Sequence, residues 1–85
     1  MEKSYLTLKR SKLGKTVIIQ KLNLEEIIKR RLLDIGLTPN TKITCILNSP
    51  GGDPRAYLIK GTLIAIRNEN ANKIIVKEDY NETKS

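Results

Sequence analysis

The stretch TKITCILNSPGGDPRAYLIKGTLIAI, residues 41–66, decides the fold of this chain. Three short apolar runs follow one another in it, at residues 43–47, 55–60 and 62–66. The first two are separated by Ser49-Pro50-Gly51-Gly52-Asp53-Pro54, which has the composition of a loop, and Gly61 separates the last two. Short runs rich in β-branched residues and divided by turn signals predict three consecutive antiparallel strands.

Further strands are predicted on both sides of this stretch. Residues 16–20 form a β-branched run after Gly14, and residues 73–77 form a similar run before a polar end. The total is about five short strands in 85 residues. Because the strands do not alternate with helices, a parallel sheet is excluded, and a small SH3-like β-barrel fits the length.

A single helix is predicted between the first and second strands. Asn23 and Glu26 have the spacing of a capping box, and Gly36 stands where a left-handed helix end is expected. A helical stripe of apolar residues is expected to face the core: Leu24, Ile27, Ile28, Leu32 and Ile35. Leu33 projects to the opposite side of this helix and is expected to be exposed. The fold class is therefore mainly β with a helical insertion.

The chain divides into three parts by composition. Residues 1–12 form a cationic lead-in segment, residues 13–77 form the domain, and residues 78–85 form a polar tail. No run approaches the ~20 apolar residues of a membrane span, and the first residues do not form a signal peptide. We therefore expect a cytoplasmic protein.

The composition argues against an enzyme. The chain has no His and one Cys, which excludes imidazole bases, Cys-His pairs and Cys-Cys zinc sites. Its carboxylates are scattered, so we expect no catalytic residues, no cofactor and no dedicated metal site, although a weak surface cation stays open. Cys45 lies on the apolar face of its predicted strand and is expected in the core.

The net charge of +7 favours an acidic partner. Residues 1–31 hold nine Lys or Arg against three Glu, so the excess lies in the first third. Nucleic acid is one candidate partner, but such binders usually stack bases on exposed aromatic side chains. Alternation places Tyr57 and Ile59 on the core face of their strand and Leu58 on the outer face.

Four ordered blocks carry a family resemblance. They are Arg30-Arg31-Leu32-Leu33-Asp34-Ile35-Gly36-Leu37-Thr38-Pro39-Asn40-Thr41, the loop 49–54, Lys60-Gly61 and Ile64-Ala65-Ile66-Arg67. With this spacing, the chain from about Leu13 to Val76 resembles the FeoA family of bacterial ferrous iron uptake. Asn40 stands where the family usually has Gly, and Asn tolerates the left-handed region better than most residues.

The resemblance implies an SH3-like barrel that acts by binding rather than by catalysis. Its implied partner is the cytosolic part of the FeoB permease for Fe(II). From the residues, we expect the partner to contact Lys29, Arg30, Leu33 and Leu58. The alternative is a small basic barrel that binds nucleic acid. The oligomeric state and the effect on the permease stay open.

Overall fold

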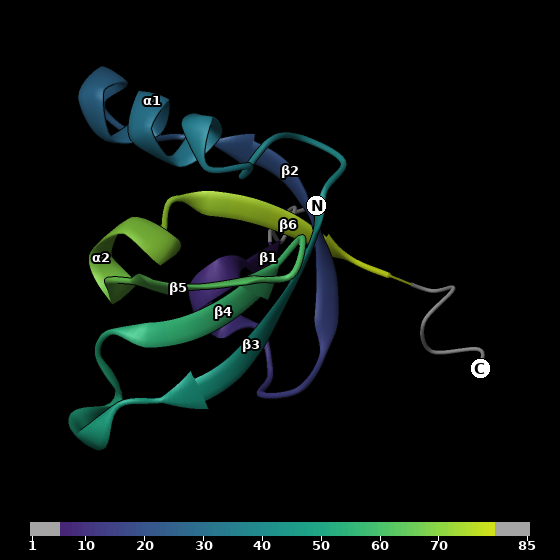
Figure 1. Ribbon diagram of the computed structural model, residues 1–85, viewed down its shortest axis with the longest axis vertical. Helices are drawn as coiled ribbons and strands as arrows, with labels where there is room; N and C mark the ends of the chain where they lie inside the picture. Colours follow the sequence, from purple (N-terminus) through teal and green to yellow (C-terminus); the bar gives the residue numbers. More distant parts are fainter. Residues whose placement is uncertain (1–5, 80–85) are drawn as a thin grey trace, which may run out of the picture.

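A computed structural model describes residues 6–79, and within them the chain forms one curled antiparallel sheet with short helices (Figure 1). The strands are β1 (Leu6–Thr7), β2 (Thr16–Leu22), β3 (Lys42–Asn48), β4 (Arg55–Ile59), β5 (Thr62–Ile66) and β6 (Ile74–Glu78). Their order across the sheet is β1-β6-β2-β3-β4-β5. Two α-helices, α1 (Glu26–Asp34) and α2 (Asn68–Ala71), and two 3-10 turns, η1 (Leu8–Arg10) and η2 (Pro50–Gly52), complete the fold. The mainly β fold with a helical insertion is confirmed.

The predicted strands between residues 41 and 66 are confirmed, and so are the predicted directions of Tyr57, Leu58 and Ile59. Leu47, which alternation places on the same face as Cys45, is instead 54% exposed, because a β-bulge shifts the register between Cys45 and Leu47. Tyr57 and Ile59 are 0% and 1% exposed, whereas Leu58 between them is 40% exposed. The turn from β4 to β5 consists of Lys60 (φ 49°) and Gly61 (φ 79°). Two successive residues of positive φ match the right-handed twist of the flanking strands, which explains Gly61.

Helix α1 begins two residues later than its capping box predicts. Its N-cap is Glu25, and no side chain there accepts a capping hydrogen bond, so the predicted role of Asn23 is wrong. The C-terminal end is as predicted: Gly36 has φ 109°, its N–H bonds to the Leu33 carbonyl, and the Leu37 N–H bonds to the Leu32 carbonyl. This pair of bonds is a Schellman motif, which places Leu37 in the core at 0% exposure.

The predicted core face of α1 is wrong in part. Ile27 and Ile35 are 70% and 50% exposed, whereas Leu33, expected on the far side, is half-buried and packs against the core. Leu32 also packs against the core, so the helix is rotated relative to the predicted stripe. The physical reason is that apolar residues occur around much of this helix, so their spacing alone does not select a face.

The core is aliphatic apart from Tyr57, and it includes the thiol of Cys45. Thirteen apolar residues are buried in one cluster, to which every strand except β1 contributes. Cys45 is 0% exposed, which confirms its predicted place in the core. Tyr57 lies beside it across the β3–β4 register. Asn40 has φ 75°, so it occupies the left-handed region that its identity permits.

The residues before Gly14 pack into the same unit. Leu8 of η1 is 0% exposed, and β1 pairs with β6. Arg55, at the start of β4, is only 9% exposed. Its guanidinium donates to the Lys9 carbonyl at 2.5 Å, to the Ser11 carbonyl at 2.9 Å and to Asn48 Oδ1 at 2.9 Å. Arg55 therefore fastens η1 to the edge of the β3–β4 hairpin.

The buried Tyr57 hydroxyl makes stability depend on pH at the alkaline end. Burial raises the pKa of Tyr57 from 10.0 to about 12, although the neighbouring Arg55 charge partly opposes this. A raised pKa means that the folded state favours the neutral phenol, so the stabilisation is complete below pH 10 and is lost as the pH rises to about 12. Two pKa units correspond to about 3 kcal/mol in the free energy of unfolding.

We expect Tyr57→Phe to remove this alkaline component. Within residues 6–79 the Tyr57 hydroxyl has no hydrogen-bond partner, so its loss changes stability at pH 7 by less than about 1 kcal/mol. Urea unfolding of both proteins at pH 7, 9, 10 and 11 measures the difference. Parallel pH profiles for the two proteins would show that Tyr57 is not the group responsible.

Candidate docking surface

The outer side of β3, β4 and β5 carries two apolar rows. Leu47 lies opposite Ala56, which lies opposite Ala65. In the neighbouring row, Leu58 lies opposite Leu63 of β5 and, on its other side, opposite the half-buried Thr44 of β3. Side chains paired in this way are about 5 Å apart at Cβ. Neighbouring rows on one face are two residues apart along each strand, so the two rows form one surface.

A β-bulge adds a further apolar side chain to this surface. The β3–β4 register shifts between Cys45 and Leu47, and Ile46 is the extra residue, 38% exposed. Opposite it, the Gly14 N–H donates to the Cys45 carbonyl at 2.7 Å. Gly14 has no side chain to cover Ile46. We use the name apolar face for the set Ile46, Leu47, Ala56, Leu58, Leu63 and Ala65.

The four predicted contact residues lie on two elements, α1 and β4. Leu58 belongs to the apolar face, but Leu33 packs against the core from α1. Arg30 is exposed and Lys29 is half-buried, both on α1. Leu63 and Leu47 were not predicted, although the two-residue turn at Lys60-Gly61 places Leu63 opposite Leu58 and could have identified it.

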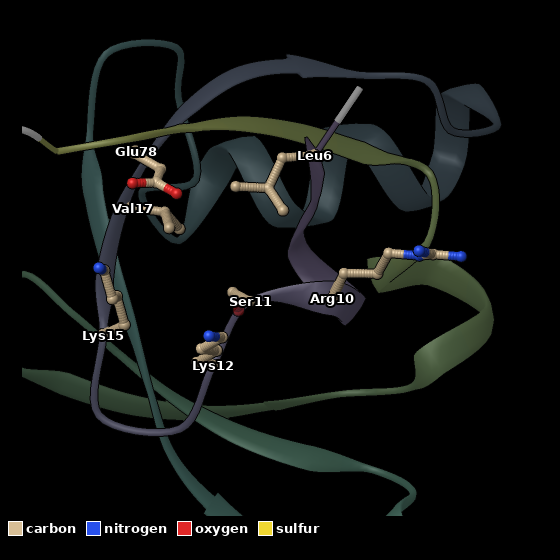
Figure 2. A pocket seen from close by; sticks show the side chains of 7 residues that line it. All are labelled: Leu6, Arg10, Ser11, Lys12, Lys15, Val17 and Glu78. Atoms are coloured by element: carbon tan, nitrogen blue, oxygen red, sulfur yellow. The ribbon is translucent and has the colours of Figure 1, made fainter. Parts of the chain in front are cut away.

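The loop from η1 to β2 forms the wall of a small cationic pocket (Figure 2). The pocket holds about 100 Å³ and is lined by Leu6, Arg10, Ser11, Lys12, Lys15, Val17 and Glu78. Figure 2 shows the Lys15 side chain extending toward the side on which Glu78 lies, while the Arg10 side chain extends away from both. The Ser11 hydroxyl already donates to the Leu8 carbonyl. Glu78 opposes an anion here, so the pocket is not a formed anion site.

Metal-binding clusters and membrane-spanning helices were the other features sought in the described part of the chain. Residues 6–79 contain no group of three or more His, Cys, Asp or Glu side chains placed to hold a metal ion. None of their helices has the length and apolar character required to cross a bilayer. The Asp53 carboxylate accepts the Asn68 N–H at 2.9 Å and so caps α2, which gives this acidic residue a structural role.

A comparison with protein families identifies the chain. The FeoA domain model matches residues 6–78. This chain belongs to the FeoA family. The match begins before the region from which the resemblance was drawn and includes β1 and η1. Family membership supports a role in ferrous iron transport. No curated protein sequence matches the chain.

Solved FeoA structures have the same fold. The FeoA protein from Chlorobium tepidum is 29% identical, with a TM-score of 0.83, over 86% of this chain and 70% of that one. The iron(II) transport protein A from Clostridium thermocellum is 26% identical, with a TM-score of 0.81, over 86% of this chain and 45% of that one.

The FeoA protein of Stenotrophomonas maltophilia, solved with zinc and described as an SH3 domain protein, is 25% identical. Its TM-score is 0.72 over 85% of this chain and 89% of that one. The SH3-like class predicted from the sequence is therefore confirmed.

Proposed function

We propose that this FeoA-family chain is a cytoplasmic accessory protein of ferrous iron uptake that acts by binding the cytosolic part of a FeoB-type Fe(II) permease. The FeoA domain match over residues 6–78 carries this proposal. The exposed apolar face supports it, because a small domain that presents several large apolar side chains together is suited to binding another macromolecule. The activity is binding, with no reaction catalysed by the chain itself.

Nucleic acid is the less favoured partner. Tyr57 is the one aromatic residue within positions 6–79, and it is 0% exposed. Tyr5 and Tyr80 lie outside the described residues. Without an exposed aromatic platform, the described surface offers cations alone, which bind nucleic acid without base stacking.

The direct test is a binding titration between the purified chain and the cytosolic domain of the permease from the same organism. We expect a saturable complex at physiological salt, and no mobility shift of a DNA or RNA duplex under the same conditions. Absence of a complex with the permease domain, together with a mobility shift of the duplex, would make nucleic acid the favoured partner.

The cations of α1 are expected to steer this encounter. We expect Lys29→Glu with Arg30→Glu to lower the association rate about tenfold at low salt, because charges near an interface act mainly on encounter. We expect a smaller difference in association rate at 0.15 M salt, because the attraction between exposed charges is then largely screened beyond ~8 Å. Stopped-flow mixing at two salt concentrations measures it.

The control for this prediction is Lys21→Glu with Lys77→Glu, which makes the same charge change on β2 and β6. An equal effect of both pairs would mean that net charge, and not the position of α1, governs the encounter.

A further inference from the structure

The exposed apolar side chains of this protein are unevenly distributed. Seven large apolar residues are exposed within residues 6–79, and four of them, Ile46, Leu47, Leu58 and Leu63, belong to the apolar face. Leu13 lies in the loop whose next residue, Gly14, is bonded to β3 beside Ile46. Of the remaining two, Ile27 is on α1 and Ile35 directly follows it, with the charged Arg31 midway between them in sequence. The apolar face is therefore the largest apolar grouping on the described surface.

The apolar face lacks the charges that usually protect an exposed sheet. Strand β5, at the end of the sheet order, has the sequence Thr-Leu-Ile-Ala-Ile with no charged residue and no proline. Exposed edge strands normally carry a Lys, a Pro or an inward-pointing charge that prevents association. The outward residues of β4, Ala56 and Leu58, are also uncharged. An unprotected sheet surface of this kind is suited to being covered by a partner.

The charged residues that border the apolar face in sequence are mostly cationic. Lys60 and Arg67, both exposed, stand at the two ends of β5, whereas Lys12 and Lys15 line the pocket beside Val17 and Glu78. The acidic residue at this margin is Asp53, whose carboxylate caps α2. An uncharged centre with a cationic margin is complementary to an apolar partner surface bordered by carboxylates.

The dimensions of the apolar face suit one secondary-structure element. Three strands spaced about 4.8 Å apart give a width of about 10 Å. This width equals the diameter of one α-helix with its side chains, about 10 Å. When an amphipathic helix docks on an apolar surface, it buries one apolar stripe and keeps its polar sides at the margin.

We propose that the apolar face is the docking surface for an amphipathic helix of the permease's cytosolic domain, apolar on one side and acidic along its flanks. The proposal rests on the proposed function for its partner and adds the surface and the chemistry of recognition. Leu47, Leu58 and Leu63 supply the buried contacts, while Lys60 and Arg67 meet the flanking carboxylates.

The test compares two variants for binding to the permease's cytosolic domain by calorimetry. Leu47→Thr with Leu63→Thr removes two half-exposed leucines, 54% and 55% exposed, and retains side chains suited to strands. We expect the dissociation constant to rise at least tenfold. The matched control is Ile27→Thr, which changes an isoleucine that is 70% exposed on α1 and is expected to leave the constant within twofold.

The outcomes separate the two proposals. Suppose that the wild type binds, that the Leu47→Thr/Leu63→Thr variant binds equally well and that Ile27→Thr binds more weakly. This result would overturn the apolar face as the docking surface and leave the proposed function intact. Absence of binding by the wild type would overturn both. Thermal melting verifies that each variant is folded, and Lys60→Glu with Arg67→Glu, which retains the leucines, provides a second test by lowering the association rate at low salt.

A membrane surface is distinguished by one further measurement. Vesicles of phosphatidylcholine with three parts in ten phosphatidylglycerol carry the anionic headgroups that a cationic margin would also attract. We expect no co-sedimentation at 0.15 M salt. Co-sedimentation that is lost in the Leu47→Thr/Leu63→Thr variant would contradict a protein helix as the occupant.

Discussion

Ile59→Asp is expected to unfold the protein. The Ile59 side chain is 1% exposed in an aliphatic cluster, with no cation among the buried residues of that cluster to meet a carboxylate. Burying an unpaired charge costs more than the loss of the apolar contacts alone, and we expect a loss of about 5 kcal/mol. A domain of this size has a total stability of about 4–13 kcal/mol, so this loss exceeds the lower end of the range and removes over a third of the upper end. Circular dichroism with thermal melting measures the loss.

Leu58→Asp is the matched control, one residue away on the same strand. Leu58 is 40% exposed on the apolar face, so an Asp carboxylate at this position is hydrated, and we expect the free energy of unfolding to change by less than about 1 kcal/mol. The same variant is expected to weaken binding to the permease domain. A folded Ile59→Asp together with an unfolded Leu58→Asp would mean that the two faces of β4 are reversed.

Arg55→Met is expected to lower the free energy of unfolding by about 3 kcal/mol. The substitution retains most of the apolar stem but leaves three acceptors without their donor: the Lys9 and Ser11 carbonyls and Asn48 Oδ1. Ser11 is 5% exposed, so solvent does not replace the bond to its carbonyl without local opening. Chemical denaturation measures the total loss, and amide hydrogen exchange is expected to show faster exchange in residues 8–12 than in β2.

The control for Arg55 is Arg67→Met. Arg67 is exposed and makes no side-chain hydrogen bond within the described residues, so a change within about 0.5 kcal/mol is expected. Equal losses in the two variants would mean that the three bonds of Arg55 contribute nothing beyond a surface charge.

Arg55 also illustrates a contact that sequence reasoning did not predict. Two of the three partners of its guanidinium lie 44 and 46 residues earlier in the chain, at Ser11 and Lys9. The lead-in segment is cationic, and no local pattern indicates that its backbone carbonyls are acceptors for a buried cation. Only the pairing of β1 with β6 and the burial of Leu8 bring this segment against β4.

The predicted docking residues show the same division. Leu58 was predicted to face outward and does so, because alternation along a strand between two turns depends on the backbone alone. Leu33 was predicted to face outward and instead packs against the core. The difference is that a helix with apolar residues on several sides has no face of its own until the sheet and the Gly36–Leu37 turn orient it.

Local sequence patterns were sufficient to predict strands β2 to β6, the turn residues and the family. Gly61, Gly36 and Asn40 have positive φ. Gly and Asn adopt this conformation more readily than other residues, so the residue types themselves indicate these turns. The rotation of α1, the attachment of η1 through Arg55 and the assembly of the apolar face could be seen in the folded structure alone. Each of these depends on contacts between distant segments, and Leu47, Leu58 and Leu63 come together because the β3–β4 bulge and the β4–β5 register set their rows side by side.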